Sequence, residues 1–238
     1  MKNIVLTSFV ADALSLGSHW IYSQREIAEK FGSMTGYSDP ATSYHPGKQA
    51  GDFTHYGDQT MVLLCSLALH GSFDLAAFAN EWRAFWENPE TQSYRDGATK
   101  ATLANLRSGL SPAQAASPSN DIAGAARIAP LFLLKWKSND DLIAAARAQT
   151  SFTHGDPAVV DAAEFFARVT LAVQEGVAIP DALRGVAELV AGNAIPSDWF
   201  DAALSSSASA TSDSAATKTH GLTCHIPEAF PAVCHLLL

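Results

Sequence analysis

Residues Gly51–Leu64 read GDFTHYGDQTMVLL, in which a polar stretch with two glycines is followed by an apolar segment. Asp is among the residues preferred at the N-cap of a helix, because its side chain accepts hydrogen bonds from the first free amides. We therefore expect Asp58 to cap a helix that continues through Thr60-Met61-Val62-Leu63-Leu64. A mostly apolar run of this kind is typical of a helix buried at the centre of a bundle.

Helical patterns lie on both sides of this segment. Ser23 and Glu26 form a capping box that opens a short helix ending near Phe31. Almost no stretch alternates with the period of two that a half-buried strand needs. The sequence thus predicts an all-α bundle of about eight to ten helices, in a single domain over residues 1–238. The other expected helices are Phe9–Leu16, Asp74–Trp86, Ala98–Leu106, Ile122–Trp136, Asp140–Ala148, Pro157–Gln174, Pro180–Val190 and a C-terminal one over Ala232–Leu238.

Two segments depart from the helical texture. Residues 32–57 are rich in Gly, Pro and aromatic residues, and a connection of this length is usually functional or disordered. The aromatic content favours an ordered, packed loop. Residues 202–219 are biased toward Ser, Ala and Thr, which fits either a flexible connection or a helix of small residues packed closely on its neighbours.

Composition excludes several classes of protein. The 238 residues are 47% hydrophobic and 16% charged with a net charge of −9, which excludes disorder over most of the chain. The sequence has no run of basic residues that would bind nucleic acid, so we expect no nucleic-acid partner. No window holds the roughly 18 consecutive apolar residues of a membrane helix, so we expect no membrane association. Three cysteines without a CxxC spacing, and the lack of a signal-peptide pattern, predict a cytoplasmic protein.

The cluster of Asp, His, Thr and Tyr over residues 51–60 is the densest concentration of polar chemistry in the chain. A helix N-terminus favours anions, and a carboxylate held there can offer oxygen to a hard cation such as Mg²⁺. Asp58 is therefore a candidate metal ligand. The alternative is that Asp58 only caps its helix.

Two further segments carry candidate ligand-binding residues. In Asn120–Pro130, Gly124 allows close backbone approach and Arg127 offers a positive fork for phosphate or carboxylate. The alternative is a tight helix contact with Arg127 in a structural ion pair. In Thr153–Pro157, His154 either donates to a ligand or belongs to the cap of the following helix.

Taken together and in order, these motifs resemble the ADP-ribosylglycohydrolase family, most closely the branch with J1-crystallin relatives. The resemblance covers nearly the whole chain. The stretches that carry it are Asp12-Ala13-Leu14, Tyr37, His45-Pro46-Gly47-Lys48, residues 51–60, Ser93–Lys100, Gly124–Pro130, Thr153-His154 and Cys224–Pro231.

The resemblance implies an orthogonal all-α bundle with a two-magnesium centre. Such an enzyme hydrolyses a glycosidic bond to ADP-ribose in an ADP-ribosylated small molecule or protein, using the metal ions to orient ribose and polarise water. It implies Asp58 as catalytic residue and metal ligand, with substrate-binding residues His55, Tyr56, Gly124, Arg127 and His154.

Several positions depart from the family pattern. Tyr56-Gly57-Asp58 stands where the family has Thr-Asp-Asp, and His19 stands beside Trp20 where many members carry an acidic residue. The family's second metal motif would follow Leu238. Because of these departures, the alternative is that the chain is a catalytically inactive family member, which serves as a crystallin-like structural protein or as an ADP-ribose binder.

The sequence closes on Leu236-Leu237-Leu238, in an amphipathic segment without a polar cap. Exposure of three leucines forfeits roughly 1.5–3 kcal/mol of burial for each side chain. We expect either a domain that lacks its C-terminal helices or a homo-oligomer formed through these leucines.

Overall fold

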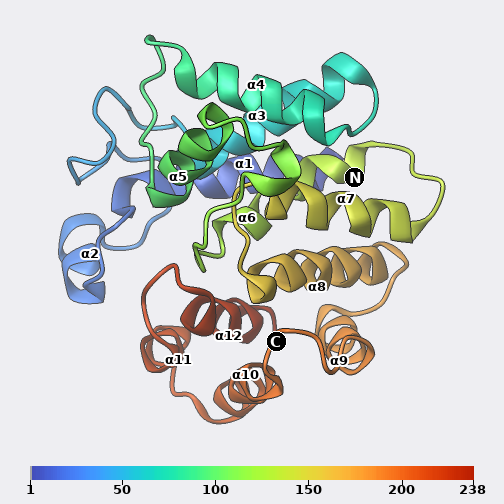
Figure 1. Cartoon of the computed structure of the whole chain (residues 1–238). Coiled ribbons are helices and arrows are strands. Elements are labelled where there is room, and N and C mark those ends of the chain that lie inside the picture. The colour runs from blue at the N-terminus through green and yellow to red at the C-terminus, as the bar shows by residue number, and fades with distance from the viewer. Residues whose placement is uncertain (1) are drawn as a thin grey trace. The chain divides into compact units, whose positions relative to one another are not determined.

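The structure is a computed structural model that describes residues 2–238 (Figure 1). These residues form twelve α-helices and three short 3₁₀ helices, and their only extended pairings are two isolated β-bridges. The predicted all-α class is confirmed. The helices are α1 (Lys2–Ser15), η1 (Leu16–Ser18), α2 (Gln24–Phe31), α3 (His55–His70), α4 (Leu75–Glu87), α5 (Gly97–Arg107), η2 (Pro112–Gln114), α6 (Ala123–Ala126), η3 (Ala129–Leu133), α7 (Asn139–Ser151), α8 (Pro157–Gln174), α9 (Ile179–Leu189), α10 (Ser197–Ser209), α11 (Asp213–His220) and α12 (Ile226–Leu237).

The chain divides into two compact units. Unit 1 comprises residues 2–115 and 127–135, and unit 2 comprises residues 116–126 and 136–238. Among the described residues, no helix is both long enough and apolar enough to cross a membrane.

Unit 1 is built around α3, which packs against α4, α1 and η3. Buried Val5 and Phe9 of α1 meet Ala129 of η3, and Met61 and Leu64 of α3 pack against them. This contact ties residues 127–135 to the N-terminal helices although they are distant in sequence.

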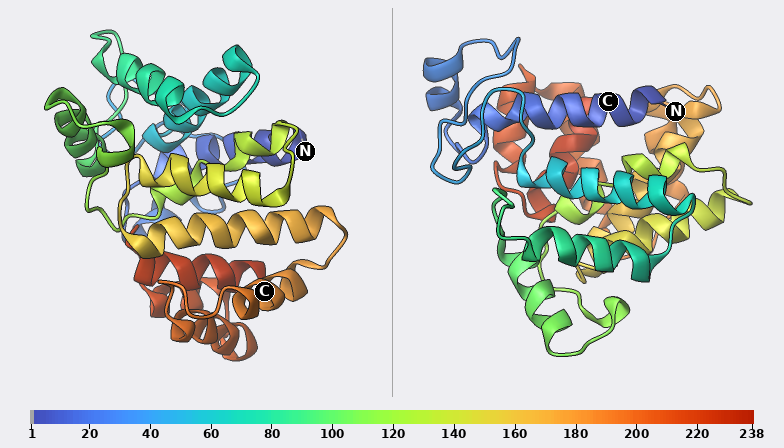
Figure 2. Two further views of the ribbon diagram at one scale, coloured as in Figure 1. Left: turned by 45° about the vertical axis from the view of Figure 1, so that its right-hand side comes forward. Right: turned by 90° about the horizontal axis from the view of Figure 1, so that it is seen from above.

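Unit 2 is built around α8, which packs along α7 and also contacts α6 and α9 (Figure 2). Its C-terminal part is held by α12, which packs against α10 and α11. Phe165 of α8 and Phe230 of α12 are both buried, with ring centroids 5.0 Å apart in an edge-to-face arrangement.

The predicted single helix over Ile122–Trp136 is wrong. The segment instead forms the short helix α6 and the 3₁₀ helix η3, with Pro130 in the first turn of η3. Proline lacks the amide donor and clashes with the preceding turn, so Pro130 disfavours the continuation of an α-helix at this point.

The Ser/Ala/Thr-biased residues 202–219 are helical except for residues 210–212, which favours the helical alternative over a flexible connection. They belong to α10 and α11, and Ser212 caps α11 by accepting a hydrogen bond from the Ala215 amide. These two helices also explain why the predicted number of helices was too low.

The start of α3 differs from the prediction. The N-cap is Thr54, whose hydroxyl accepts from the Tyr56 amide, whereas Asp58 lies in the first turn of the helix. Asp12 of α1 completes the cap: its carboxylate accepts from the Thr54 amide at 2.8 Å, the Thr54 hydroxyl at 2.6 Å and the Gly57 amide at 3.0 Å. A residue 42 positions upstream therefore decides where α3 begins.

This cap requires glycine at position 57. A Cβ atom on Gly57 would lie 2.1 Å from Asp12 Oδ2 and 2.8 Å from Phe53 Cβ. Asp12 cannot swing away without losing its three hydrogen bonds, so any side chain at position 57 disrupts the cap.

We predict that Gly57→Ala lowers the free energy of unfolding by about 1–3 kcal/mol, because the added methyl group overpacks the contact between α1 and α3. Chemical denaturation measures the change.

Gly185→Ala is the matched control, since a Cβ on this exposed glycine of α9 meets nothing within 4 Å. It should stabilise by about 0.5–1 kcal/mol through helix propensity. Equal effects of the two substitutions would contradict the steric account.

Candidate functional site

An ion pair occupies the predicted metal-ligand position in unit 1. The Lys48 ammonium donates to both carboxylate oxygens of Asp58, at 3.0 Å and 2.8 Å. Both side chains are largely withdrawn from solvent, with 14% of Lys48 and 13% of Asp58 exposed. The Lys48 ammonium thus neutralises the carboxylate of Asp58, the residue predicted from the sequence to be a metal ligand.

Neighbouring carboxylates in unit 1 are also engaged. Burial raises the pKa of Asp12, and the charge of Asp58 adds to that rise, against the opposing effect of the hydrogen bonds from Thr54 and Gly57. Asp52 turns to its own loop, where it accepts from the Gln49 amide at 2.8 Å.

These residues do not fit a two-magnesium centre. Mg²⁺ needs several oxygen ligands in near-octahedral geometry. Both oxygens of Asp58 bind Lys48, the oxygens of Asp12 hold the start of α3, and Gly57 has no side chain to offer. The magnesium predicted from the resemblance therefore finds no adequate ligand set among these residues.

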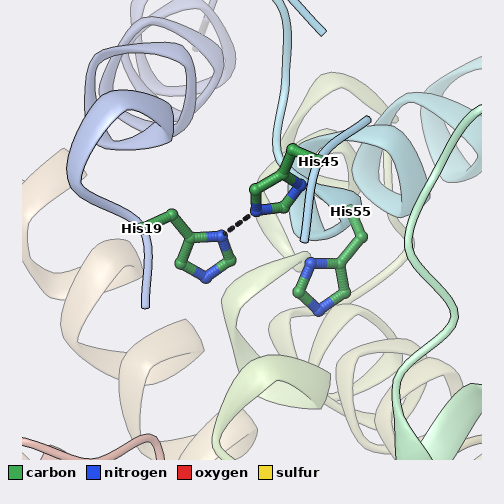
Figure 3. Close-up of side chains that lie close together, drawn as sticks. All are labelled: His19, His45 and His55. Carbon is green, nitrogen blue, oxygen red and sulfur yellow. Dashed lines mark hydrogen bonds between the residues drawn. The ribbon is translucent and has the colours of Figure 1, made fainter. Parts of the chain in front are cut away.

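Three histidines converge beside this pair. His19 follows η1, His45 lies in the long loop, and His55 is the first residue of α3 (Figure 3). His19 Nδ1 lies 2.8 Å from His45 Nε2, and one ring nitrogen from each histidine falls within 4.8 Å of the others. His45 and His55 are buried, with 2% and 0% exposed. Among the described residues, these three histidines are the group of His, Cys, Asp or Glu side chains whose ligand atoms lie close enough together to hold a metal ion.

Burial keeps two of these imidazoles neutral. It lowers the pKa of His19 to about 3, with the charges of His55 and His45 adding to the effect. Burial likewise lowers the pKa of His45 to about 4, helped by His55 and Lys48. Both rings are therefore uncharged near neutral pH, and a neutral imidazole can offer its unprotonated nitrogen to a metal ion.

Asp96, at the N-cap of α5, faces the third histidine. Its Oδ2 lies 3.3 Å from His55 Nε2, close enough for electrostatic attraction although the geometry is not that of a hydrogen bond. Burial raises the pKa of Asp96, but His55 and the Thr99 amide outweigh it, so the pKa lies below its ordinary value. An ionised Asp96 orients the His55 ring.

Aromatic side chains surround the histidines. The Trp20 ring stacks on His19 at 4.6 Å and meets Tyr44 and Tyr94 edge-on at 4.6 Å and 4.7 Å. The backbone of Trp20 has a positive φ of 65°. Among the described residues, every other residue with a positive φ is a glycine. Such backbone strain concentrates at functional sites, where the surrounding structure holds it in place.

A cavity of about 700 Å³ opens next to these aromatic rings. Its walls combine two tyrosines with two cationic side chains, and Lys100 lies 5.5 Å from the centroid of the Tyr94 ring. The Arg95 guanidinium donates to the Trp86 carbonyl. The lining residues are Tyr44, Pro46, Gly47, Pro89, Thr91, Gln92, Ser93, Tyr94, Arg95 and Lys100.

Arg127 lies in the core of unit 1 rather than at its surface. It is 2% exposed, donates to Gln59 Oε1 at 2.9 Å and lies 5.9 Å from the Phe78 ring. Burial lowers its pKa to about 10, against the charge of Asp96. This placement supports the structural alternative, and a role in substrate binding stays a prediction.

Gly124 and His154 come together in unit 2. A Cβ on Gly124 would lie 2.9 Å from His154 Nδ1, so the glycine permits close packing of α6 on the end of α7. His154 is 1% exposed and its Nδ1 lies 2.8 Å from the Thr153 hydroxyl. A second cavity, of about 530 Å³, lies elsewhere in unit 2 and is lined by none of the predicted site residues.

The comparisons with known proteins agree with this helical architecture. The model of the ADP-ribosylglycohydrolase family matches residues 1–238. The chain belongs to the ADP-ribosylglycohydrolase family. A solved structure described as an ADP-ribosylglycohydrolase-related protein complex is similar to it, with a TM-score of 0.71 and 19% identity over 98% of this chain and 72% of that one. A search of curated proteins gave no match. The finer resemblance to J1-crystallin relatives stays a prediction.

The histidine cluster was missed from the sequence. His55 was a predicted substrate-binding residue and His19 a departure from the family pattern, but nothing in their spacing indicates that they meet. The long loop between them brings His45 into place, and its aromatic content was the available signal.

We predict that the metal-free protein loses stability as the pH falls from 6.5 toward 4. In this window the unfolded chain protonates its histidines while His19 and His45 stay neutral in the fold, so protons favour unfolding. Each contributes a slope of up to about 1.4 kcal/mol per pH unit. Melting temperatures recorded against pH with a chelator present measure it.

His45→Gln should make this pH dependence shallower, because one of the titrating groups is gone. An equal slope in wild type and His45→Gln would contradict the assignment.

Proposed function

We propose that this protein binds the ADP-ribosyl group of a small molecule or protein at the cavity of unit 1, without the paired magnesium ions of a metal-dependent hydrolase. Family membership supports a hydrolase-like function. The observation that carries the finer proposal is the Lys48–Asp58 pair, which places an ammonium where the resemblance implies a metal ion.

The chemistry of the cavity suits an ADP-ribosyl group. Its volume of about 700 Å³ falls in the usual range for small-molecule sites. Exposed Lys100 and Arg95 offer positive charge to a diphosphate, and Tyr44 and Tyr94 offer flat faces for an adenine or ribose. This local positive charge stands out in a chain whose net charge is −9.

His55 and Tyr56 connect the cavity to the ion pair. The His55 ring contacts Tyr94, a cavity residue, with centroids 5.8 Å apart, and the Tyr56 ring lies 3.9 Å from His55. Both residues belong to the first turn of α3, as does Asp58. A ligand seated against Tyr94 thus extends toward the residues that the sequence selected.

The second candidate is hydrolysis of the glycosidic bond with Mg²⁺ bound by Asp58. One observation favours it: Asp58 retains some exposure in the first turn of α3, where an anionic ligand set would be stabilised. This function requires Lys48 to leave the carboxylate. The two candidates therefore differ in what Lys48 does.

We predict that ADP-ribose binds the wild-type protein with a Kd that changes less than twofold between a chelator and millimolar Mg²⁺. Lys100→Ala should weaken binding about tenfold, since one charge-assisted hydrogen bond to phosphate is lost. Isothermal titration calorimetry measures both. Lys137→Ala, at an exposed lysine of unit 2, is the matched control and should bind as wild type does.

Lys48→Ala distinguishes the two candidates. Removal of the ammonium frees Asp58, but a single carboxylate supplies too few oxygen ligands, so Mg²⁺ should leave the melting temperature of both this variant and the wild type unchanged in a thermal shift experiment. A magnesium-dependent shift and glycoside hydrolysis in the wild type, both abolished by Asp58→Asn, would overturn the proposal in favour of the second candidate.

The cellular compartment and the oligomeric state of the protein are proposed from its sequence. We place the protein in the cytoplasm on its cysteine usage. Self-association through the C-terminal leucines is consistent with the exposure of Leu236 and Leu237, at 58% and 36%, and the oligomeric state in solution tests it.

A further inference from the structure

We propose that His19, His45 and His55 form a binding site for a transition-metal ion, Zn²⁺ in the first instance, with three imidazole nitrogens as ligands and a fourth position open. One ring nitrogen from each residue lies within 4.8 Å of the others. The inference does not depend on ADP-ribose binding.

The spacing between the His19 and His45 nitrogens is close to what a tetrahedral ion requires, and the His55 nitrogen, within 4.8 Å of them, would move closer when an ion binds. Zn–N bonds of about 2.0–2.1 Å place two ligand nitrogens about 3.3 Å apart. His19 Nδ1 and His45 Nε2 stand 2.8 Å apart and share a proton, so an ion would replace that proton and widen the gap by about half an ångström. Rotation of the side chains supplies a movement of this size.

A second observation, independent of the spacing between the nitrogens, also points to a bound ion: His55 has a buried ring nitrogen without a partner. Its side chain is completely buried, and its Nδ1 has no hydrogen-bond partner. Buried polar atoms are nearly always satisfied, so an orphaned ring nitrogen needs an explanation. Figure 3 shows this ring directed toward the His19 and His45 rings, where an ion would satisfy it.

The outer surroundings match those of a histidine-ligated metal. Metal-bound imidazoles commonly direct their other nitrogen to a carboxylate, which fixes the tautomer. Asp96 Oδ2 lies 3.3 Å from His55 Nε2 and is placed for this role. Stacking on Trp20 fixes the plane of His19, and a strained φ of 65° at Trp20 is the backbone conformation that positions it.

The ligand chemistry selects the class of metal. Neutral imidazole suits Zn²⁺, Cu²⁺, Ni²⁺ and Co²⁺, whereas Mg²⁺ prefers carboxylate, carbonyl and water oxygens. The trio has no oxygen ligand. The site therefore differs in both position and chemistry from a magnesium centre at Asp58.

The test is a titration of the chelator-treated full chain with Zn²⁺ by isothermal calorimetry, together with the visible spectrum of the Co²⁺-loaded protein. We expect one equivalent of Zn²⁺ to bind and Co²⁺ to give the intense absorption of a tetrahedral site. His45→Gln should weaken Zn²⁺ binding at least about 100-fold, because loss of a ligand exceeds the effect of losing a supporting contact.

His70→Gln is the matched control, since His70 is exposed and pairs with Glu81 outside the cluster. It should bind Zn²⁺ as wild type does. His19→Gln is the second variant: its ring is less buried than the other two, so it should keep the circular dichroism of the wild type if His45→Gln fails to fold.

Absence of saturable binding at one equivalent would overturn the proposal and leave the three rings as a hydrogen-bonded stack. Equal affinity in wild type and in a folded His19→Gln variant would also overturn it, since the ion would then bind elsewhere. Zn²⁺ binding without ADP-ribose binding would support this site while refuting the proposed function.

Discussion

The carboxylate of Asp12 accepts three hydrogen bonds from the segment that opens α3, and the geometry of unit 1 depends on them. They fix Thr54 as the cap and bring α1 against Gly57. Because these contacts set where the helix begins, they also set where His55, Tyr56 and Asp58 point. Charge-assisted hydrogen bonds at a helix N-terminus are among the stronger interactions that a fold can use, since they satisfy orphan amides and complement the dipole.

The same constraint excludes an acidic side chain at position 57, one of the positions at which the sequence departs from the metal motif that the resemblance implies. A carboxylate at position 57 cannot coexist with Asp12 in its present place, because even a methyl group would meet it at 2.1 Å. With position 57 lost as a ligand, Asp58 is left as a single carboxylate, and Lys48 neutralises it. The residues that remain in the neighbourhood are imidazoles and aromatic rings, whose chemistry differs from that of an oxygen-lined centre.

The sequence predicted local structure well where the determining residues are neighbours. The predicted bounds of α8, Pro157–Gln174, match the structure because Asp156 caps the helix and Pro157 starts it, both within one turn. It failed where the decision is made at a distance. Thr54 and Asp58 are both reasonable caps, and Asp12, far upstream, selects the first. The meeting of His19, His45 and His55 depends on the path of a long loop that no periodicity describes, and Arg127 was as compatible with a ligand as with the core contact to Gln59 that it makes.

The most direct test of this account is a double-mutant cycle between Asp12→Ala and Thr54→Val, with the free energy of unfolding measured by denaturation. If the carboxylate of Asp12 holds the start of α3 through Thr54, the two substitutions should be coupled by at least about 1 kcal/mol, so that the double variant is less destabilised than the sum of the single ones. Additive effects would mean that Asp12 and Thr54 act independently, and would contradict the arrangement on which the candidate site depends.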